Sequence, residues 1–332
     1  MKNRFTSFIS YIAAALPLLM IYSLPARAEY TFELVNPPGA LYIQAFGINS
    51  QGIVTGNADD GEAAFGFAYD SKSGEYTKNS DGFRALDISN SGVMVGNVDD
   101  ICAMRDQTGN VTEFFPPSFG AGSSCQARGV NSNGKVSGFE VDADGIFLGF
   151  VYDSNSGTYE EFLPSAWTIT HALNAQGQNV GSVRLETDQA FPGSPAGHYG
   201  YLREKDGAVK YFAISQSAPG QSRARGISES GVVAGWYVES PAFEAKSYVT
   251  TLSSGSAFEQ IALTDDQVLY RKPCNPDVAP PPGPGYESFT DVIASQIRND
   301  GVVVGTCTDG YFNPVTLDLV TYSAGFIATP IH

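Results

Sequence analysis

The 332-residue chain is poor in basic residues, in histidine and in charge of either sign. It has 19 Lys and Arg against 35 Asp and Glu, for a formal net charge of −16, and charged residues make up 16% of it. An acidic surface repels phosphate, so the composition argues against a nucleic acid as partner. There are three histidines, one of them the terminal residue His332, which argues against a multi-histidine metal site. With 42% hydrophobic and 12% aromatic residues, the chain is nevertheless globular.

Long hydrophobic runs are also scarce. The longest extends from about Phe8 to Leu19, follows two basic residues and ends near the small-residue pattern Ala26-Arg27-Ala28. This run is shorter than the roughly 20 residues that span a bilayer. The pattern predicts a signal peptide over residues 1–28. We therefore expect an extracellular or periplasmic product without a transmembrane anchor after cleavage.

The chain contains only four cysteines. Their small number and wide spacing fit disulfides in an oxidising compartment, and the absence of a C-x-x-C pair makes a metal site a weak alternative. Three pairings are possible. Proximity in the sequence favours Cys102–Cys125 and Cys274–Cys307.

Glycine is abundant, with 36 residues, and much of it belongs to a repeat. A ten-residue pattern of the type G-I-N-x-x-G-x-V-x-G occurs six times, at residues 47–56, 87–96, 129–138, 172–181, 226–235 and 296–305. In each copy an Asn-x-x-Gly or Ser-x-x-Gly tetrad, or a close variant, predicts a tight turn between two short strands. Aromatic third strands, such as 64–69 and 147–152, and fourth strands, such as 158–163, follow.

Four strands in about 40 residues is the size of a propeller blade. We therefore predict an all-β fold, a six-bladed β-propeller of four-stranded antiparallel blades that forms a single domain over residues 29–332. A sandwich or a β-solenoid built from the same hairpins is the alternative. The early strand Tyr30–Val35 is expected to pair with the last blade and so to close the ring. A proline-rich surface loop is predicted at about 265–286, where Cys274 would fasten it to blade six.

These repeats resemble the bacterial extracellular HAF repeat over about residues 30–326. The triplet that gives the repeat its name is degenerate here, at Ala63-Ala64-Phe65 and, approximately, at Gly197-His198-Tyr199. The resemblance implies a secreted, propeller-like repeat protein. Many relatives carry a C-terminal sorting helix that this chain lacks, which favours release over anchoring. The resemblance assigns no catalytic residue.

Arginine is concentrated in the first strand of each repeat, the strand that lines the channel of a propeller. Of the nine arginines after residue 28, five fall in six hexapeptides that together hold 36 residues, namely Arg84, Arg128, Arg223, Arg225 and Arg298. Guanidinium binds carboxylate or sulfate through two hydrogen bonds, so an anionic glycan is the predicted class of ligand, with Arg84, Arg128, Arg223 and Arg225 as binding residues. The alternative is that these arginines bind the backbone of neighbouring blades.

Three further groups are candidates for chemistry. His171 lies in one of the same strands and would act as the general base of a uronate lyase, with arginines that neutralise the substrate carboxylate, although a packed histidine is the alternative. Trp167 and Trp236 could stack on a sugar or pack within the blades. Asp142 and Asp144 have the spacing to supply oxygen ligands to Ca²⁺, or they are acidic turn residues. No other cofactor is expected.

The function favoured by these patterns is that of a monomeric binding or interaction protein whose partner is an anionic glycan or another extracellular protein. An enzyme that acts on anionic polysaccharide is the second hypothesis. A calcium-stabilised surface protein is the third.

Overall fold

The computed structural model describes residues 29–79, 81–239, 244–253, 257–264, 267–269, 287–313 and 318–331. The predicted signal peptide lies outside these residues, as does most of the predicted loop at 265–286. The described residues form β-strands joined by turns, and none of them lies in an α-helix. No helix among them could cross a membrane.

The strands assemble into antiparallel sheets in which consecutive strands are neighbours. The first sheet contains β2 (Tyr42–Ile48), β3 (Ile53–Asp59), β4 (Ala64–Asp70) and β5 (Glu75–Lys78). The second contains β6 (Phe83–Ile88), β7 (Met94–Val98), β8 (Ile101–Arg105) and β9 (Val111–Glu113). The third contains β10 (Ser124–Val130), β11 (Lys135–Val141), β12 (Phe147–Asp153) and β13 (Thr158–Phe162). The predicted order of hairpin, third strand and outer strand is confirmed in each of them. The third strand is aromatic in the first and third sheets, whereas β8 contains no aromatic residue.

A larger, nine-stranded sheet follows. It contains β14 (Thr168–Leu173), β15 (Asn179–Leu185), β16 (Gly197–Arg203), β17 (Val209–Ile214), β18 (Ser217–Ile227), β19 (Val232–Glu239), β20 (Ala245–Thr251), β21 (Phe258–Ile261) and β22 (Val268–Leu269). Two antiparallel groups make up this sheet, β14–β17 and β18–β20 with β22. They are joined by a single parallel bridge between His198 and Gln221, and by β21, which pairs in parallel with β17 of the neighbouring group. A plain four-stranded blade was therefore the wrong prediction here, because β21 hydrogen-bonds across to the adjacent group.

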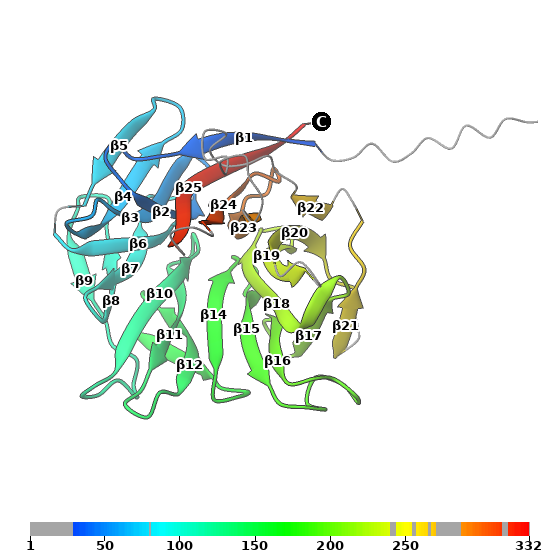
Figure 1. Cartoon of the computed structure of the whole chain (residues 1–332). Coiled ribbons are helices and arrows are strands. Elements are labelled where there is room, and N and C mark those ends of the chain that lie inside the picture. Colours follow the sequence, from blue (N-terminus) through cyan, green and yellow to red (C-terminus); the bar gives the residue numbers. More distant parts are fainter. Residues whose placement is uncertain are drawn as a thin grey trace, which may run out of the picture.

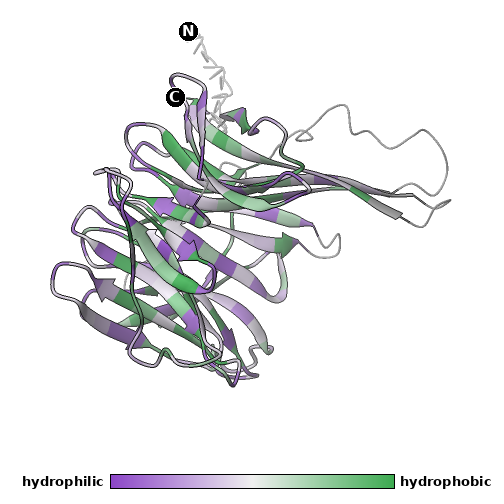
Figure 2. Ribbon diagram, turned by 90° about the vertical axis from the view of Figure 1, so that its left-hand side faces the viewer, coloured by the Kyte–Doolittle hydropathy of each residue, from purple (hydrophilic) through white to green (hydrophobic). Residues whose placement is uncertain are grey.

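The last sheet joins the two ends of the described chain. It contains β23 (Glu287–Ile297), β24 (Val303–Asn313), β25 (Asp318–Ile331) and β1 (Glu29–Val35), in the order β1-β25-β24-β23. β1 pairs antiparallel with β25 along its whole length, from Glu29 opposite Ile331 to Val35 opposite Gly325. The predicted pairing of the early strand with the last sheet is confirmed. Strands β23 to β25 are long, and they extend beyond the body formed by the other sheets (Figure 2).

The sheets stand around a common axis, as in a β-propeller (Figure 1). The innermost strands contact one another in sequence order, from β2 through β6, β10, β14 and β18 to β23, and β23 in turn contacts β2. Small residues permit this approach. The alanine that precedes the bulge described below is fully buried in five of these strands, at Ala45, Ala85, Ala127, Ala224 and Ala294.

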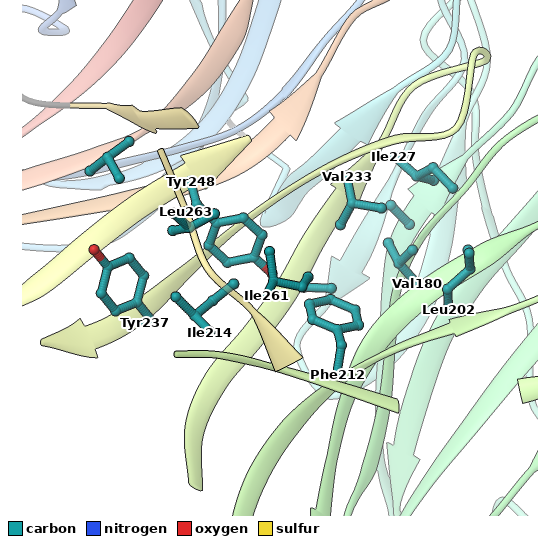
Figure 3. Packing of buried hydrophobic residues seen from close by; sticks show 13 residues of the cluster. Val180, Leu202, Phe212, Ile214, Ile227, Val233, Tyr237, Tyr248, Ile261 and Leu263 are labelled. Carbon is teal, nitrogen blue, oxygen red and sulfur yellow. The ribbon is translucent and has the colours of Figure 1, made fainter. Parts of the chain in front are cut away.

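The hydrophobic core lies between neighbouring sheets. In the cluster between β14–β17 and β18–β22, Phe212 and Tyr248 meet edge to face with ring centroids 6.4 Å apart, and Ile214 and Val233 pack beside them (Figure 3). Each fully buried side chain of this size stabilises the fold by about 1.5–3 kcal/mol. Because each aromatic third strand contributes to such a cluster, the repeat that defines the sequence also supplies the core.

The first repeated turn shows why asparagine recurs with glycine. Asn49 Oδ1 accepts hydrogen bonds from the N–H groups of Gln51 and Ile53, at 3.1 and 3.0 Å, and Gly52 closes the turn with a φ of 89°. That backbone conformation is open to glycine and strained for residues with a Cβ. Asn131 and Asn174 accept the same type of bond, as do the hydroxyls of Ser89 and Ser228.

The same asparagines connect one inner strand to the next. The Asn131 side-chain amide donates to the carbonyl oxygen of Asn174 at 3.0 Å, and the Asn174 amide donates to the carbonyl oxygen of Ser228 at 3.2 Å. Asn49 donates to Ser89 in this way at 3.4 Å, and Arg298 donates to Asn49 at 3.4 Å. These bonds therefore run around the axis and include a link between the last and first repeats.

The disulfide Cys102–Cys125 is present and buried, which confirms the first predicted pairing. It joins β8 to β10, the inner strand of the next sheet. The second predicted bridge involves Cys274, which lies outside the described residues, so Cys274–Cys307 stays a prediction.

We predict that the two roles of Asn131 can be separated by mutation. Asn131→Ala removes both the turn cap and the bond to Asn174, so the free energy of unfolding should fall by about 1–3 kcal/mol. Asn131→Ser restores a turn cap of the kind seen at Ser89 but cannot reach the next strand, so its loss should be smaller. Urea denaturation of the two variants measures the difference. Equal stability of both variants would show that the bridge between strands contributes nothing.

Candidate functional site

Each inner strand carries a β-bulge at the same position of the repeat. The ladder between the first two strands shifts register around Phe46, Leu86, Arg128, His171, Arg225 and Ser295. A bulge leaves one residue out of the pairing and turns its side chain away from the regular alternation of the sheet. The six bulge residues therefore occupy equivalent places around the axis, and three consecutive ones are Arg128, His171 and Arg225.

The residue after the bulge is constrained by the neighbouring strand. At Gly129, an added Cβ would lie 2.9 Å from the Cα of Ala172 and 2.9 Å from the carbonyl oxygen of His171. Only a very small residue fits there. The bulge and the glycine after it thus act together. Gly129 lets β10 approach β14 closely, and the bulge sets the direction of the Arg128 side chain.

We call three of these residues, Arg128, His171 and Arg225, the bulge cluster. Their side chains interact electrostatically. Burial together with the positive charges of Arg225, Arg128 and Arg223 holds the pKa of His171 well below 6.5. Burial, together with the charges of Arg128 and Arg223, lowers the pKa of Arg225 to about 9. At neutral pH the cluster therefore consists of two half-buried guanidinium groups and a buried, neutral imidazole.

These cations lack a compensating anion. In the part of the chain that the structure describes, no ion pair joins Arg128, Arg223 or Arg225 to a carboxylate. The Nε atoms of the three residues are buried and have no hydrogen-bond partner there. Arg128 instead packs over Phe46 and Phe139, with its Cζ atom 5.8 and 5.5 Å from the ring centroids. Unpaired buried donors are unfavourable, and an anion that accepted from them would remove the penalty.

The arginines predicted as one group thus divide into three. Arg128, Arg223 and Arg225 lie close enough for their charges to interact, and among the described residues none of them donates to the backbone of a neighbouring sheet. Arg298 follows the alternative, because it donates to the Asn49 carbonyl and pairs with Asp300. Arg84 is exposed on β6, and no contact described here joins it to the cluster.

Both tryptophans lie beside Arg223. The Arg223 Cζ atom is 5.4 Å from the Trp167 ring centroid and 4.8 Å from that of Trp236. Trp167 also meets His198 edge to face, with centroids 4.4 Å apart. His198, which the sequence presents as a remnant of the repeat motif, therefore belongs to this group. Burial and the charges of Arg223 and Arg184 lower its pKa to about 4.

A separate cavity of about 230 Å³ lies at the turn end of the inner strands. Residues from all six inner strands or the turns after them line it, among them Asp87, Gln296 and Arg298, whereas the bulge cluster does not. Asp87 is 3% exposed and its Oδ2 accepts from the N–H of Val130 at 2.9 Å. Burial raises the pKa of Asp87 to about 7, against the opposing effect of hydrogen bonds from Val130, Ile88 and Gln296.

Asp142 forms a turn. Its Oδ1 accepts from the N–H groups of Asp144 and Ile146, each at 2.9 Å. Among the described residues, no group of three or more His, Cys, Asp and Glu side chains could hold a metal ion. Calcium binding by Asp142 and Asp144 stays a prediction, and the geometry gives Asp142 a structural role.

No protein-family model matches the chain, and no curated protein matches it. The resemblance to the HAF repeat therefore remains an expectation. Among solved structures, the chain is similar to the β-propeller domain of the Trilobed protease from Pyrococcus furiosus, at 12% identity and a TM-score of 0.45, over 85% of this chain and 82% of that one. It is similar to a luciferin-regenerating enzyme at 10% identity and a TM-score of 0.45, over 90% and 95% of the two chains. It is also similar to an oligogalacturonate lyase in complex with manganese, at 9% identity and a TM-score of 0.43, over 92% and 97%.

We predict that Asp87 makes stability fall as pH rises. The unfolded chain loses this proton near pH 3.8 and the folded chain near 7, so folding is most favoured below 3.8 and is disfavoured progressively up to about 7. Asp87→Asn keeps an acceptor for Val130 but does not titrate. It should remove up to about 1.4 kcal/mol per pH unit from the slope of the unfolding free energy in that interval. Parallel slopes for the variant and the natural protein would contradict this assignment.

Proposed function

We propose that the chain forms a closed six-bladed propeller that works outside the cytoplasm as a binding protein for an anionic glycan. The succession of inner-strand contacts from β2 to β23 and back to β2 supports six blades, as does the occurrence of the bulge in all six inner strands. The buried disulfide Cys102–Cys125 and the sequence of residues 1–28 support the location.

One observation carries the ligand class. Arg128 and Arg225 sit on two of three successive bulges, with His171 between them, and their Nε atoms are buried without a partner or a counter-charge among the described residues. Guanidinium groups that are held in place by a rigid sheet are preorganised for carboxylate or sulfate. Carboxylated and sulfated glycans are abundant extracellular ligands that carry these groups.

The acidic character of the rest of the chain fits a specific site. With 35 acidic against 19 basic residues, the surface at large does not attract polyanions. An anionic ligand would therefore bind where the cations are concentrated, at the bulge cluster.

We predict that Arg225→Ala weakens binding of an acidic glycan by about tenfold or more, because it removes a charge-assisted hydrogen bond of roughly 1.5–3 kcal/mol. Isothermal titration calorimetry with polyuronate and sulfated oligosaccharides measures this. Arg84→Ala is the matched control, since Arg84 is an exposed arginine on another inner strand. The proposal fails if neither ligand binds the natural protein, or if both variants lose the same affinity.

A second function, β-elimination on a polyuronate, is favoured by one feature, the unprotonated state of His171 among arginines. In such a reaction His171 takes the proton on the carbon next to the carboxylate. The electron pair forms a C=C bond as the neighbouring C–O bond breaks, and the departing oxygen gains a proton. The arginines stabilise the negative charge that develops on the carboxylate.

We predict that, if the protein is a lyase, His171→Gln abolishes formation of the unsaturated product while binding persists. The ultraviolet absorbance of the C=C bond measures turnover, and calorimetry measures binding in parallel. Binding of polyuronate by the natural protein without any rise in absorbance would exclude this second function and leave the binding protein.

A further inference from the structure

Beside the bulge cluster lies a second set of polar atoms that lack partners. Three buried atoms, Arg223 Nε, His198 Nδ1 and Trp236 Nε1, have no hydrogen bond among the described residues. They come from three strands, β18, β16 and β19. Arg223 and Trp236 are cross-strand partners, and His198 lies close enough to Arg223 for that charge to lower its pKa. The three orphaned atoms thus belong to one place, which we call the tryptophan–arginine group together with Trp167.

Ordinary packing does not account for such a group. Each buried polar atom without a partner costs about 1–3 kcal/mol. Of the eleven such side-chain atoms among the described residues, three belong to this group. Trp236 Nε1 and Arg223 Nε can only donate, and the histidine nitrogen can donate in one of its tautomers. Neighbouring donors of this kind match an oxygen anion supplied by a ligand.

The surroundings of Arg223 restrict the shape of that anion. The Arg223 guanidinium lies over the rings of both Trp167 and Trp236, at cation–π distance from each. Its N–H groups lie in the guanidinium plane and point to the edge. A planar carboxylate, which can accept two parallel bonds along that edge, fits this arrangement.

The group is continuous with the bulge cluster. Arg223 and Arg225 are two residues apart on β18, which corresponds to about 7 Å along a strand. The charge of Arg223 acts both on His171 and Arg225 and on His198. The distance between the two anion sites is therefore similar to the distance between neighbouring sugar rings in a chain.

We propose that the tryptophan–arginine group is a second carboxylate subsite, so that the protein binds an oligomer of uronic acid across two adjacent units. This inference rests on the proposed function of the bulge cluster as an anion site. It predicts that affinity rises with the number of uronate units, because only an oligomer engages both sites.

The chain provides a specific probe for this experiment. Its only two tryptophans are Trp167 and Trp236, so intrinsic tryptophan fluorescence reports on the surroundings of the second subsite. Galacturonic acid and its trimer would be titrated by calorimetry and by fluorescence. We expect the trimer to bind at least about tenfold more tightly than the monomer and to change the fluorescence.

Two variants test the assignment of atoms. Trp236→Phe keeps an aromatic ring and removes the N–H, and Arg223→Lys keeps the charge and removes the planar edge. Both should reduce the ratio of trimer to monomer affinity toward one, whereas Arg84→Ala should retain the ratio. Thermal denaturation of each variant verifies that it is folded.

The outcomes separate the two proposals. Equal affinity for monomer and trimer, with unchanged fluorescence, would overturn the second subsite and leave the bulge cluster as an anion site. A sulfated trisaccharide that bound as tightly as the uronate trimer would overturn the carboxylate assignment. If none of these anions bound, the proposed function itself would fail.

Discussion

Hydrogen bonds from the side chain that starts a repeated turn connect four pairs of neighbouring inner strands and hold the inner part of the molecule together. An asparagine such as Asn174 caps its own turn through its oxygen and reaches the next inner strand through its amide. One side chain thus fixes both the end of a strand and its distance from the neighbour. Because these bonds recur around the axis, the inner strands stay at a common level, and the bulges that precede the turns come to equivalent positions.

Much of this architecture can be predicted from the sequence, because turn glycines and aromatic strands recur at blade-sized intervals. The pairing of β1 with β25 and the buried alanine before five of the six bulges follow from the same periodicity. The contacts of the individual arginines do not follow from this periodicity. Arg84 and Arg223 occupy the same place in their repeats, yet only Arg223 has indole rings beside it. Those neighbours come from β19 and from the segment before β14, so long-range packing decides the outcome.

The proposed anion site illustrates a conflict between stability and ligand binding. Buried cations without counter-charges destabilise the free protein, and the lowered pKa of Arg225 expresses that cost. The acidic remainder of the chain adds a second effect, since it repels an anionic ligand at long range. Added salt screens that repulsion, so encounter with a polyanion would become faster as ionic strength rises, the reverse of ordinary electrostatic steering.

The antiparallel pairing of β1 with β25 also constrains how the molecule can fold. These strands stand at opposite ends of the described chain, about 300 residues apart, and their ladder is among the most non-local contacts a chain of this length can form. Closing so long a loop carries a large entropic cost that local hairpins do not. The individual hairpins can therefore form during synthesis, but the ring can be completed only after the last strand has been made. Until β1 pairs with it, the completed β25 presents an unpaired edge, and the first strand of a second molecule could occupy that edge in place of the chain's own.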